Sequence, residues 1–226
     1  MKVKLPSLLY LLAATILVFG AVFTRSVATP PPHSPSGFSD TQVSGGIATL
    51  YAADPLLRSF CFADGGAGHV FLNHQLFNRC SDVAYNYQPE SLSVGMEGRR
   101  VGTIVDLGSP TELAQRYDYG DGWVKGQGYA SLRVQDGKVL VAKGRDSQAV
   151  QALKESSLLF KEGKPTASAP VKLGNVYLAR ITDETDKSIQ LIVKFIVIAY
   201  TPEQSVTIRW QLLCSTQSEN AAPCGA

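Results

Sequence analysis

SIQLIVKFIVIAY, residues 188–200, is the stretch that decides the fold. Its apolar side chains occupy both sets of alternating positions. A strand formed here therefore has two apolar faces and is expected at the centre of a sheet, covered on both sides. A membrane-spanning helix is excluded, because about 20 apolar residues are needed to cross a bilayer and Lys194 interrupts this shorter run. The β-branched content of the segment also favours a strand.

Two further strands and two short polar connectors flank this segment. Residues 206–212 alternate between apolar and polar side chains. In residues 176–182, Val176 and Leu178 are opposed to Tyr177, Ala179 and Ile181. The connectors, residues 183–187 and 201–205, have the length of common hairpin loops. The sequence therefore predicts a three-stranded antiparallel meander as the centre of the fold.

The meander also predicts a binding surface. If each turn is centred in its connector, Arg180, Lys194 and Trp210 lie on the same face of the sheet and form a cationic, aromatic surface. The alternative is that the two charges lie at the sheet margin while their aliphatic stems pack against apolar neighbours. Register inferred from loop centres shifts easily by one residue, so both interpretations stay open.

Further elements are predicted upstream of the meander. Asp136-Gly137 separates two alternating runs, which is the strongest short-range signal for a hairpin. A helix is expected over residues 146–162, because apolar side chains recur at helical spacing and Gly163 follows as a stop; its apolar positions are Val150, Leu153 and Phe160. The predicted fold class is α+β: an antiparallel sheet of roughly six to eight strands, with this one main helix packed on a face.

The N-terminus has the layout of an export signal. Lys2 and Lys4 precede an uncharged run of 16 residues, residues 8–23, and Ser26-Val27-Ala28 follows as a small-x-small cleavage site. The alternative is an uncleaved membrane anchor. Three parts are therefore expected: residues 1–28 as a signal peptide or anchor, a Pro/Ser-rich linker to residue 44, and a single globular domain over residues 45–226.

An even number of cysteines in an exported chain predicts disulfides. The four cysteines allow three connectivities, of which local pairing is favoured: Cys61 with Cys80, and Cys214 with Cys224. A long-range pairing between the N- and C-terminal regions is the alternative. Their spacing matches neither a zinc finger nor a CxxC redox pair, so no metal and no cofactor are predicted.

The best residues for catalysis are Asp64, His69 and His74, with Asp82 and Cys61 nearby in the sequence. They support the hypothesis of a secreted hydrolase, with Cys61 or Cys80 as a nucleophile and His69 or His74 as its base. His69 and His74 are five positions apart, so they form neither a strand pair on one face nor a helical i, i+4 pair. No nucleophile elbow and no SxxK motif is present. An enzyme is therefore the less favoured interpretation.

A stretch rich in glycine and aromatic residues is the most distinctive in the chain. Residues 117–129 combine four glycines with carboxylates and rings, of which Tyr119, Trp123 and Tyr129 are the candidate ligand-binding residues. Such a loop is typical of a surface that stacks on a sugar or a peptide. The alternative is a connector whose rings pack against the edge of the core.

The favoured function is an exported, non-catalytic binding or assembly domain located in the periplasm, outside the cell or at a membrane. A formal net charge of +2 and the lack of a basic stripe argue against nucleic acid as a partner. The expected partner is a glycan or a protein at the cell surface, and a carbohydrate or cell-wall binder is the sharper alternative. Membrane contact is expected only through an uncleaved N-terminal segment.

Overall fold

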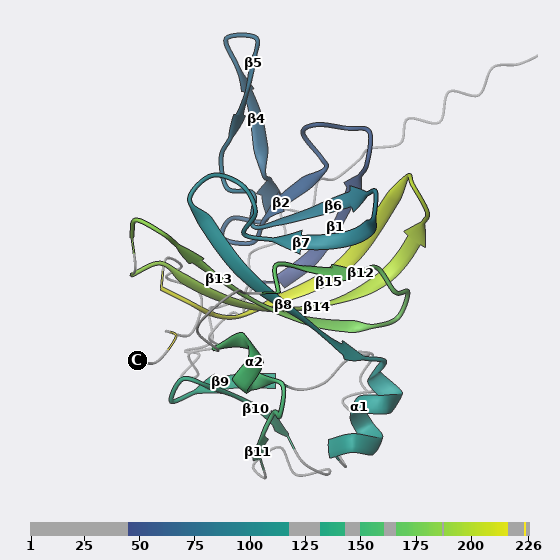
Figure 1. Cartoon of the computed structure of the whole chain (residues 1–226), viewed down its shortest axis with the longest axis vertical. Helices are drawn as coiled ribbons and strands as arrows, with labels where there is room; N and C mark the ends of the chain where they lie inside the picture. The colour runs from purple at the N-terminus through teal and green to yellow at the C-terminus, as the bar shows by residue number, and fades with distance from the viewer. Residues whose placement is uncertain are drawn as a thin grey trace, which may run out of the picture. The chain divides into compact units, whose positions relative to one another are not determined.

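A computed structural model describes residues 45–117, 132–142, 150–160, 166–186, 188–216 and 224, all within the compact unit Asp40–Ala226 (Figure 1). Strands hold 58% of these residues and helices 8%. The described chain is therefore an antiparallel β structure with several sheets and two short helices. The predicted α+β class, with one main helix on a single sheet, is wrong.

The central sheet has five antiparallel strands in the order β1–β15–β14–β13–β8. They are β1 (Gly45–Tyr51), β8 (Arg100–Gly108), β13 (Val176–Asp183), β14 (Gln190–Thr201) and β15 (Ser205–Ser215). Strands β13, β14 and β15 are the predicted meander, and β14 is the middle strand of the five. Every residue from 191 to 197 is buried. The prediction of a central strand covered on both sides is therefore confirmed.

A β-bulge shifts the register between β14 and β15. Between the turn and Ala199, the paired residues are those expected for a turn centred in residues 201–205. Beyond Ala199 the pairing shifts by one residue, because Ile198 has no partner. Trp210 consequently lies opposite Phe195 rather than opposite the next residue. Because side chains alternate between faces, this one extra residue moves Trp210 to the other side of the sheet.

Arg180 and Lys194 do share a face, but Trp210 lies on the opposite one, so the predicted cationic, aromatic surface is not formed. The Arg180 guanidinium stacks 5.0 Å from the ring centroid of Phe160 and donates to the Gln190 side chain. Lys194 is buried, and burial lowers its pKa to about 7. Both cations are thus packed within the protein. The alternative, with both charges at the sheet margin, is also wrong for Lys194, because that residue is buried on the central strand β14.

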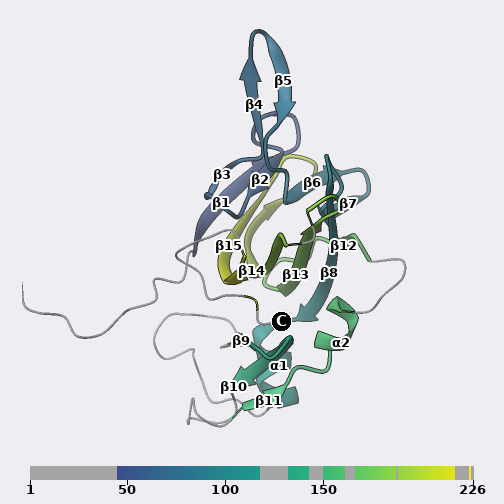
Figure 2. The ribbon, with the colours of Figure 1, turned by 90° about the vertical axis from the view of Figure 1, so that its left-hand side faces the viewer.

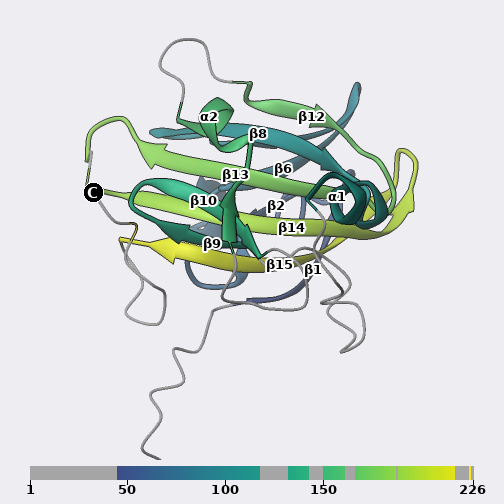
Figure 3. The ribbon, with the colours of Figure 1, turned by 90° about the horizontal axis from the view of Figure 1, so that it is seen from below.

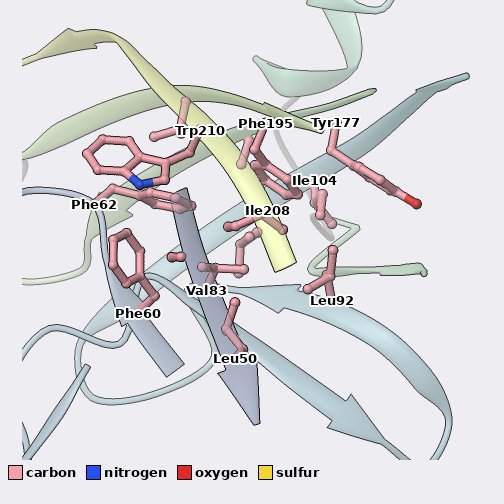
Figure 4. Packing of buried hydrophobic residues seen from close by; sticks show 14 of the residues in the cluster. Leu50, Phe60, Phe62, Val83, Leu92, Ile104, Tyr177, Phe195, Ile208 and Trp210 are labelled. Carbon is pink, nitrogen blue, oxygen red and sulfur yellow. The ribbon is translucent and has the colours of Figure 1, made fainter. Parts of the chain in front are cut away.

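A second five-stranded sheet, in the order β12–β7–β6–β2–β3, packs against one face of the central sheet. Its strands are β2 (Ser59–Cys61), β3 (Gly66–Ala67), β6 (Val83–Tyr87), β7 (Glu90–Val94) and β12 (Ser168–Pro170). The core between the two sheets contains a chain of aromatic rings whose neighbouring centroids lie 5.3–6.1 Å apart (Figure 4). These rings belong to Phe60, Phe62, Tyr177, Phe195 and Trp210.

The other face of the central sheet is covered by two helices and a three-stranded sheet (Figure 3). These elements are α1 (Pro110–Tyr117), β9 (Leu132–Gln135), β10 (Lys138–Ala142), β11 (Val150–Ala152) and α2 (Ser156–Leu159). The hairpin predicted at Asp136-Gly137 joins β9 to β10 and is confirmed. The buried apolar residues of this hairpin form a second core with the apolar side chains of β13 and β14 on this face of the central sheet.

The helix predicted over residues 146–162 is not present in the described part of that range. Residues 150–152 instead form β11 and pair with β10, and only Ser156–Leu159 is helical. A three-residue strand followed by a turn can place apolar side chains at the same sequence spacing as a helix, so the apolar spacing in this segment was ambiguous. Leu153 and Leu159 still belong to the buried core on this face of the central sheet, so the segment covers the sheet as expected, without being a long helix.

A two-stranded hairpin, β4 (His69–Leu72) and β5 (Gln75–Asn78), projects from the rest of the fold (Figures 1 and 2). It pairs with no strand of the two large sheets. Both predicted disulfides are present, Cys61–Cys80 and Cys214–Cys224. Two disulfides indicate an oxidising environment.

None of the helices in the described ranges has the length and apolar character needed to span a bilayer. The predicted signal peptide and linker, residues 1–44, lie outside the described residues, as does most of the Gly/aromatic stretch.

Candidate binding surface

Hairpin β4–β5 exposes large apolar side chains on both of its faces. Phe71 and Leu76 form a cross-strand pair on one face, 54% and 41% exposed. Leu72 and Phe77 lie on the other face and are 56% and 43% exposed. A two-stranded ribbon is at best marginally stable in water on its own, so the hairpin depends on what holds it at its base.

The two histidines of the hairpin lie at its opposite ends. His69 begins β4 at the base, while Asn73 and His74 form the turn with positive φ values of 49° and 63°. Two consecutive positive φ values are typical of the type I′ turn, whose twist matches that of paired strands. His69 and His74 therefore do not converge on a common site.

His69 is buried and joins three segments at the base. Its Nδ1 lies 2.7 Å from the Ser59 hydroxyl, and its Nε2 lies 2.8 Å from a Glu97 carboxylate oxygen. With the ring proton on Nε2, His69 donates to Glu97 and accepts a hydrogen bond from Ser59. A hydrolase also places a hydroxyl, an imidazole and a carboxylate in sequence. Here, however, the Ser59 hydroxyl is enclosed by protein. Ser59 is only 1% exposed, and a Cβ added at Gly68 would lie 2.3 Å from the Ser59 Oγ.

Two further links close the base of the hairpin. The disulfide between Cys61 and Cys80 joins the chain just before the hairpin to the chain just after it. Asp64 forms an ion pair with Arg79, so this predicted catalytic residue is engaged at the base as well. Together with His69, these contacts fix the direction in which the hairpin projects.

Asp82 lies directly beneath this base and is fully buried. Its carboxylate accepts a hydrogen bond from the Phe62 amide at 2.8 Å and lies 3.9 Å from Nε of Arg100. Burial raises its pKa from 3.8 to about 6, although Arg100 and the backbone amides oppose the rise. Desolvation disfavours the charged form more than a single partner at this distance favours it.

Cys61, Cys80 and Asp82 have their side-chain donor atoms within 4.8 Å of one another. Both sulfur atoms are bonded to each other, and a disulfide does not supply the thiolates that a metal requires. The cluster is therefore read as a buried carboxyl beside a disulfide, and no metal is assigned to it.

An open groove of about 840 Å³ runs along the Phe71 side of the hairpin. Its walls come from the end of β1, the loop that follows, the β14–β15 turn and the hairpin itself. Six of its lining residues are apolar: Tyr51, Ala53, Pro55, Leu56, Leu57 and Phe71. The acidic side chains at its margin are Asp54, whose carboxylate accepts the amides of the next two leucines, and exposed Glu203.

The sequence did not identify the apolar hairpin as a site. Asn73-His74 between two apolar pairs was the available signal, but an exposed hairpin and a buried one have the same pattern. The candidate ligand-binding residues Tyr119, Trp123 and Tyr129 lie outside the described residues, so their prediction stays a prediction. Comparison of the chain with protein-family models, with curated proteins and with solved structures gave no match.

Proposed function

We propose that the chain is an exported, non-catalytic binding module that captures another protein through hairpin β4–β5 and the groove beside it. The observation that carries the proposal is the exposure of Phe71, Leu72, Leu76 and Phe77 on a hairpin whose base is fixed by a disulfide. Contiguous exposed apolar side chains next to a groove are typical of an interaction site.

The rigid base supports this proposal over a merely loose loop. A ribbon held by Cys61–Cys80 and by His69 presents its side chains in a fixed direction, so less conformational entropy is lost when a partner binds. Aromatic side chains with few rotatable bonds add contact area at low entropic cost, and Phe71 and Phe77 provide them.

A protein partner fits the surface better than a lipid bilayer. Bacterial and plasma membranes present anionic headgroups, which attract basic side chains. The groove beside the hairpin carries Asp54 and Glu203 at its margin instead, and neither would favour an anionic surface. A concave apolar wall also accommodates a discrete side chain, which a bilayer does not offer.

The proposal is tested by selecting ligands from a phage-displayed library of random peptides on the immobilised full chain. Affinities of the enriched peptides are then measured by fluorescence polarisation against Phe71→Ser, Phe77→Ser and the control Leu158→Ser. Leu158 on α2 is 50% exposed, similar to the hairpin residues, but it lies on the opposite side of the central sheet. We expect both hairpin variants to bind at least about tenfold more weakly than the unmodified chain, and we expect the control to bind as well as the unmodified chain.

Two results would contradict the proposal. One is that no peptide is enriched, or that enriched peptides bind the hairpin variants as well as they bind the unmodified chain. The other is that the full chain binds vesicles of phosphatidylcholine with phosphatidylglycerol and that Phe77→Ser abolishes this binding, which would assign the hairpin to a membrane. Circular dichroism and Tm of each variant establish that it is folded.

A further inference from the structure

The outer edge of β1 is open among the described residues. Ala52 donates its amide to the Gln204 carbonyl, and strand alternation then directs the amides of Leu50 and Ala48 toward β15. The amides of Thr49 and Ile47 point the other way. No described residue hydrogen-bonds to them, whereas the next outward amide, that of Tyr51, is bonded to the Leu57 carbonyl.

The sequence of β1 contains none of the usual features that protect an edge strand. Natural edges are commonly protected by charged residues, by proline or by a bulge that twists the strand away. Strand β1 reads Gly-Gly-Ile-Ala-Thr-Leu-Tyr, and its pairing with β15 runs without a register shift. Ile47 is 68% exposed beside this edge. Among the described residues, β1 therefore presents an uncharged edge without a bulge, on which another strand can pair.

The open edge leads directly into the groove. Tyr51 is the last residue of β1 and also lines the groove, so a segment that lies along β1 passes from the edge onto the groove walls. The free charge it would meet there is that of Glu203, because the Asp54 carboxylate already accepts two backbone amides. An occupant with a basic side chain at this point would be complementary in charge.

We propose that the partner adds an extended strand to β1 and places an apolar side chain in the groove and a lysine or arginine beside Glu203. This inference rests on the proposed function and specifies the class of partner: a different polypeptide with an exposed, β-prone segment that carries one basic residue. Backbone hydrogen bonds to Ile47 and Thr49 provide much of the affinity, and the groove provides the specificity. A second copy of this chain fits less well, because β1 itself has no basic residue to meet Glu203.

The direct test uses a fluorescent decapeptide that alternates valine and threonine and carries one arginine, prepared with the arginine at either end. Ile47→Pro removes an outward amide without removing a bond to β15, and Ile47→Ala is the matched control that keeps the amide. We expect the better of the two peptides to bind Ile47→Pro at least about tenfold more weakly than Ile47→Ala. Replacing the arginine by glutamate, or Glu203 by glutamine, should each weaken binding about threefold or more.

Equal binding of the peptide to Ile47→Pro and Ile47→Ala would overturn strand addition. If Ile47→Pro does not fold, two forms of the same peptide decide the question, each methylated on the backbone nitrogens along one of its two edges. Strand addition is excluded if both methylated forms still bind. The two proposals also fail in different ways. If library peptides lose affinity for Phe71→Ser but not for Ile47→Pro, the proposed binding function is supported and strand addition to β1 is contradicted. If neither the library nor the decapeptides bind, both are wrong.

Discussion

Two short hairpins, β4–β5 and β9–β10, differ in what their apolar side chains contact. In β9–β10, Leu132, Val139 and Val141 are buried against the second face of the central sheet. In β4–β5, the corresponding large apolar residues are 41–56% exposed, and none of them belongs to either buried core of the described residues. The turns are alike, since both hairpins are joined by two residues with positive φ, Asn73-His74 and Asp136-Gly137.

This difference shows that the two hairpins are stabilised by different interactions. Hairpin β9–β10 is held by burial of its own side chains, which contributes about 1.5–3 kcal/mol for each large apolar group. Hairpin β4–β5 is held from outside, by a disulfide, an ion pair and His69 at its base. Its apolar residues are thus left free of a structural role, which is what a contact surface requires.

The largest effect is expected for a core residue of the buried hairpin. Leu132→Ala should lower the free energy of unfolding by about 2–4 kcal/mol, because it removes a buried side chain and leaves a cavity in the second core. Chemical denaturation monitored by fluorescence would measure this change. A loss below about 0.5 kcal/mol would mean that β9–β10 packs more loosely than described.

The second effect concerns the base of the exposed hairpin. Replacing both Cys61 and Cys80 by serine should destabilise the protein by about 3 kcal/mol, since a loop of 19 residues is no longer closed in the unfolded chain. Hydrogen exchange should become faster at the amides of β4 and β5 than at those of β9 and β10. Equal acceleration in both hairpins would contradict a local role for this disulfide.

A smaller, pH-dependent effect is expected at Asp82. Because its pKa is raised from 3.8 to about 6 in the folded state, the folded protein retains a proton there that the unfolded chain has lost. Stability is therefore lost as the pH rises through about 6. Relative to Asp82→Asn, the unmodified protein should lose about 2 kcal/mol between pH 4 and pH 6. Parallel stability curves for the two proteins would show that the carboxyl is not perturbed.

The smallest effect on stability is expected for the exposed hairpin itself. Phe77→Ala should change the free energy of unfolding by less than about 0.5 kcal/mol, because the side chain is already 43% exposed and lies outside both cores. The same denaturation experiment as for Leu132→Ala measures it. A loss above about 2 kcal/mol would show that Phe77 packs within the fold and would weaken its assignment to a contact surface.

Part of the fold could be predicted from the sequence, because some patterns have one physical solution. Residues 191–197 are apolar at every position except Lys194, and only a strand covered on both sides buries them all. Asp136-Gly137 fixed one hairpin, and local spacing fixed both disulfides. The helix over residues 146–162 failed because apolar spacing alone does not distinguish a helix from a short strand followed by a turn.

The candidate site was less predictable, for a physical reason. Its residues are apolar and neutral, so they lack the chemical signature by which His69 or Asp64 is noticed in a sequence. Their exposure depends on the lack of a covering layer, which is a property of the tertiary structure. The side on which Trp210 lies was equally hidden, because it depends on the single unpaired residue Ile198.

The whole of hairpin β4–β5 lies inside the ring that Cys61 and Cys80 close. A protease that cuts the chain at its turn, next to His74, therefore releases no fragment while the ring is intact. The two pieces would migrate together on a non-reducing gel and separate only after a reductant is added. A protein nicked at this exposed turn would thus still carry both halves of the proposed contact surface.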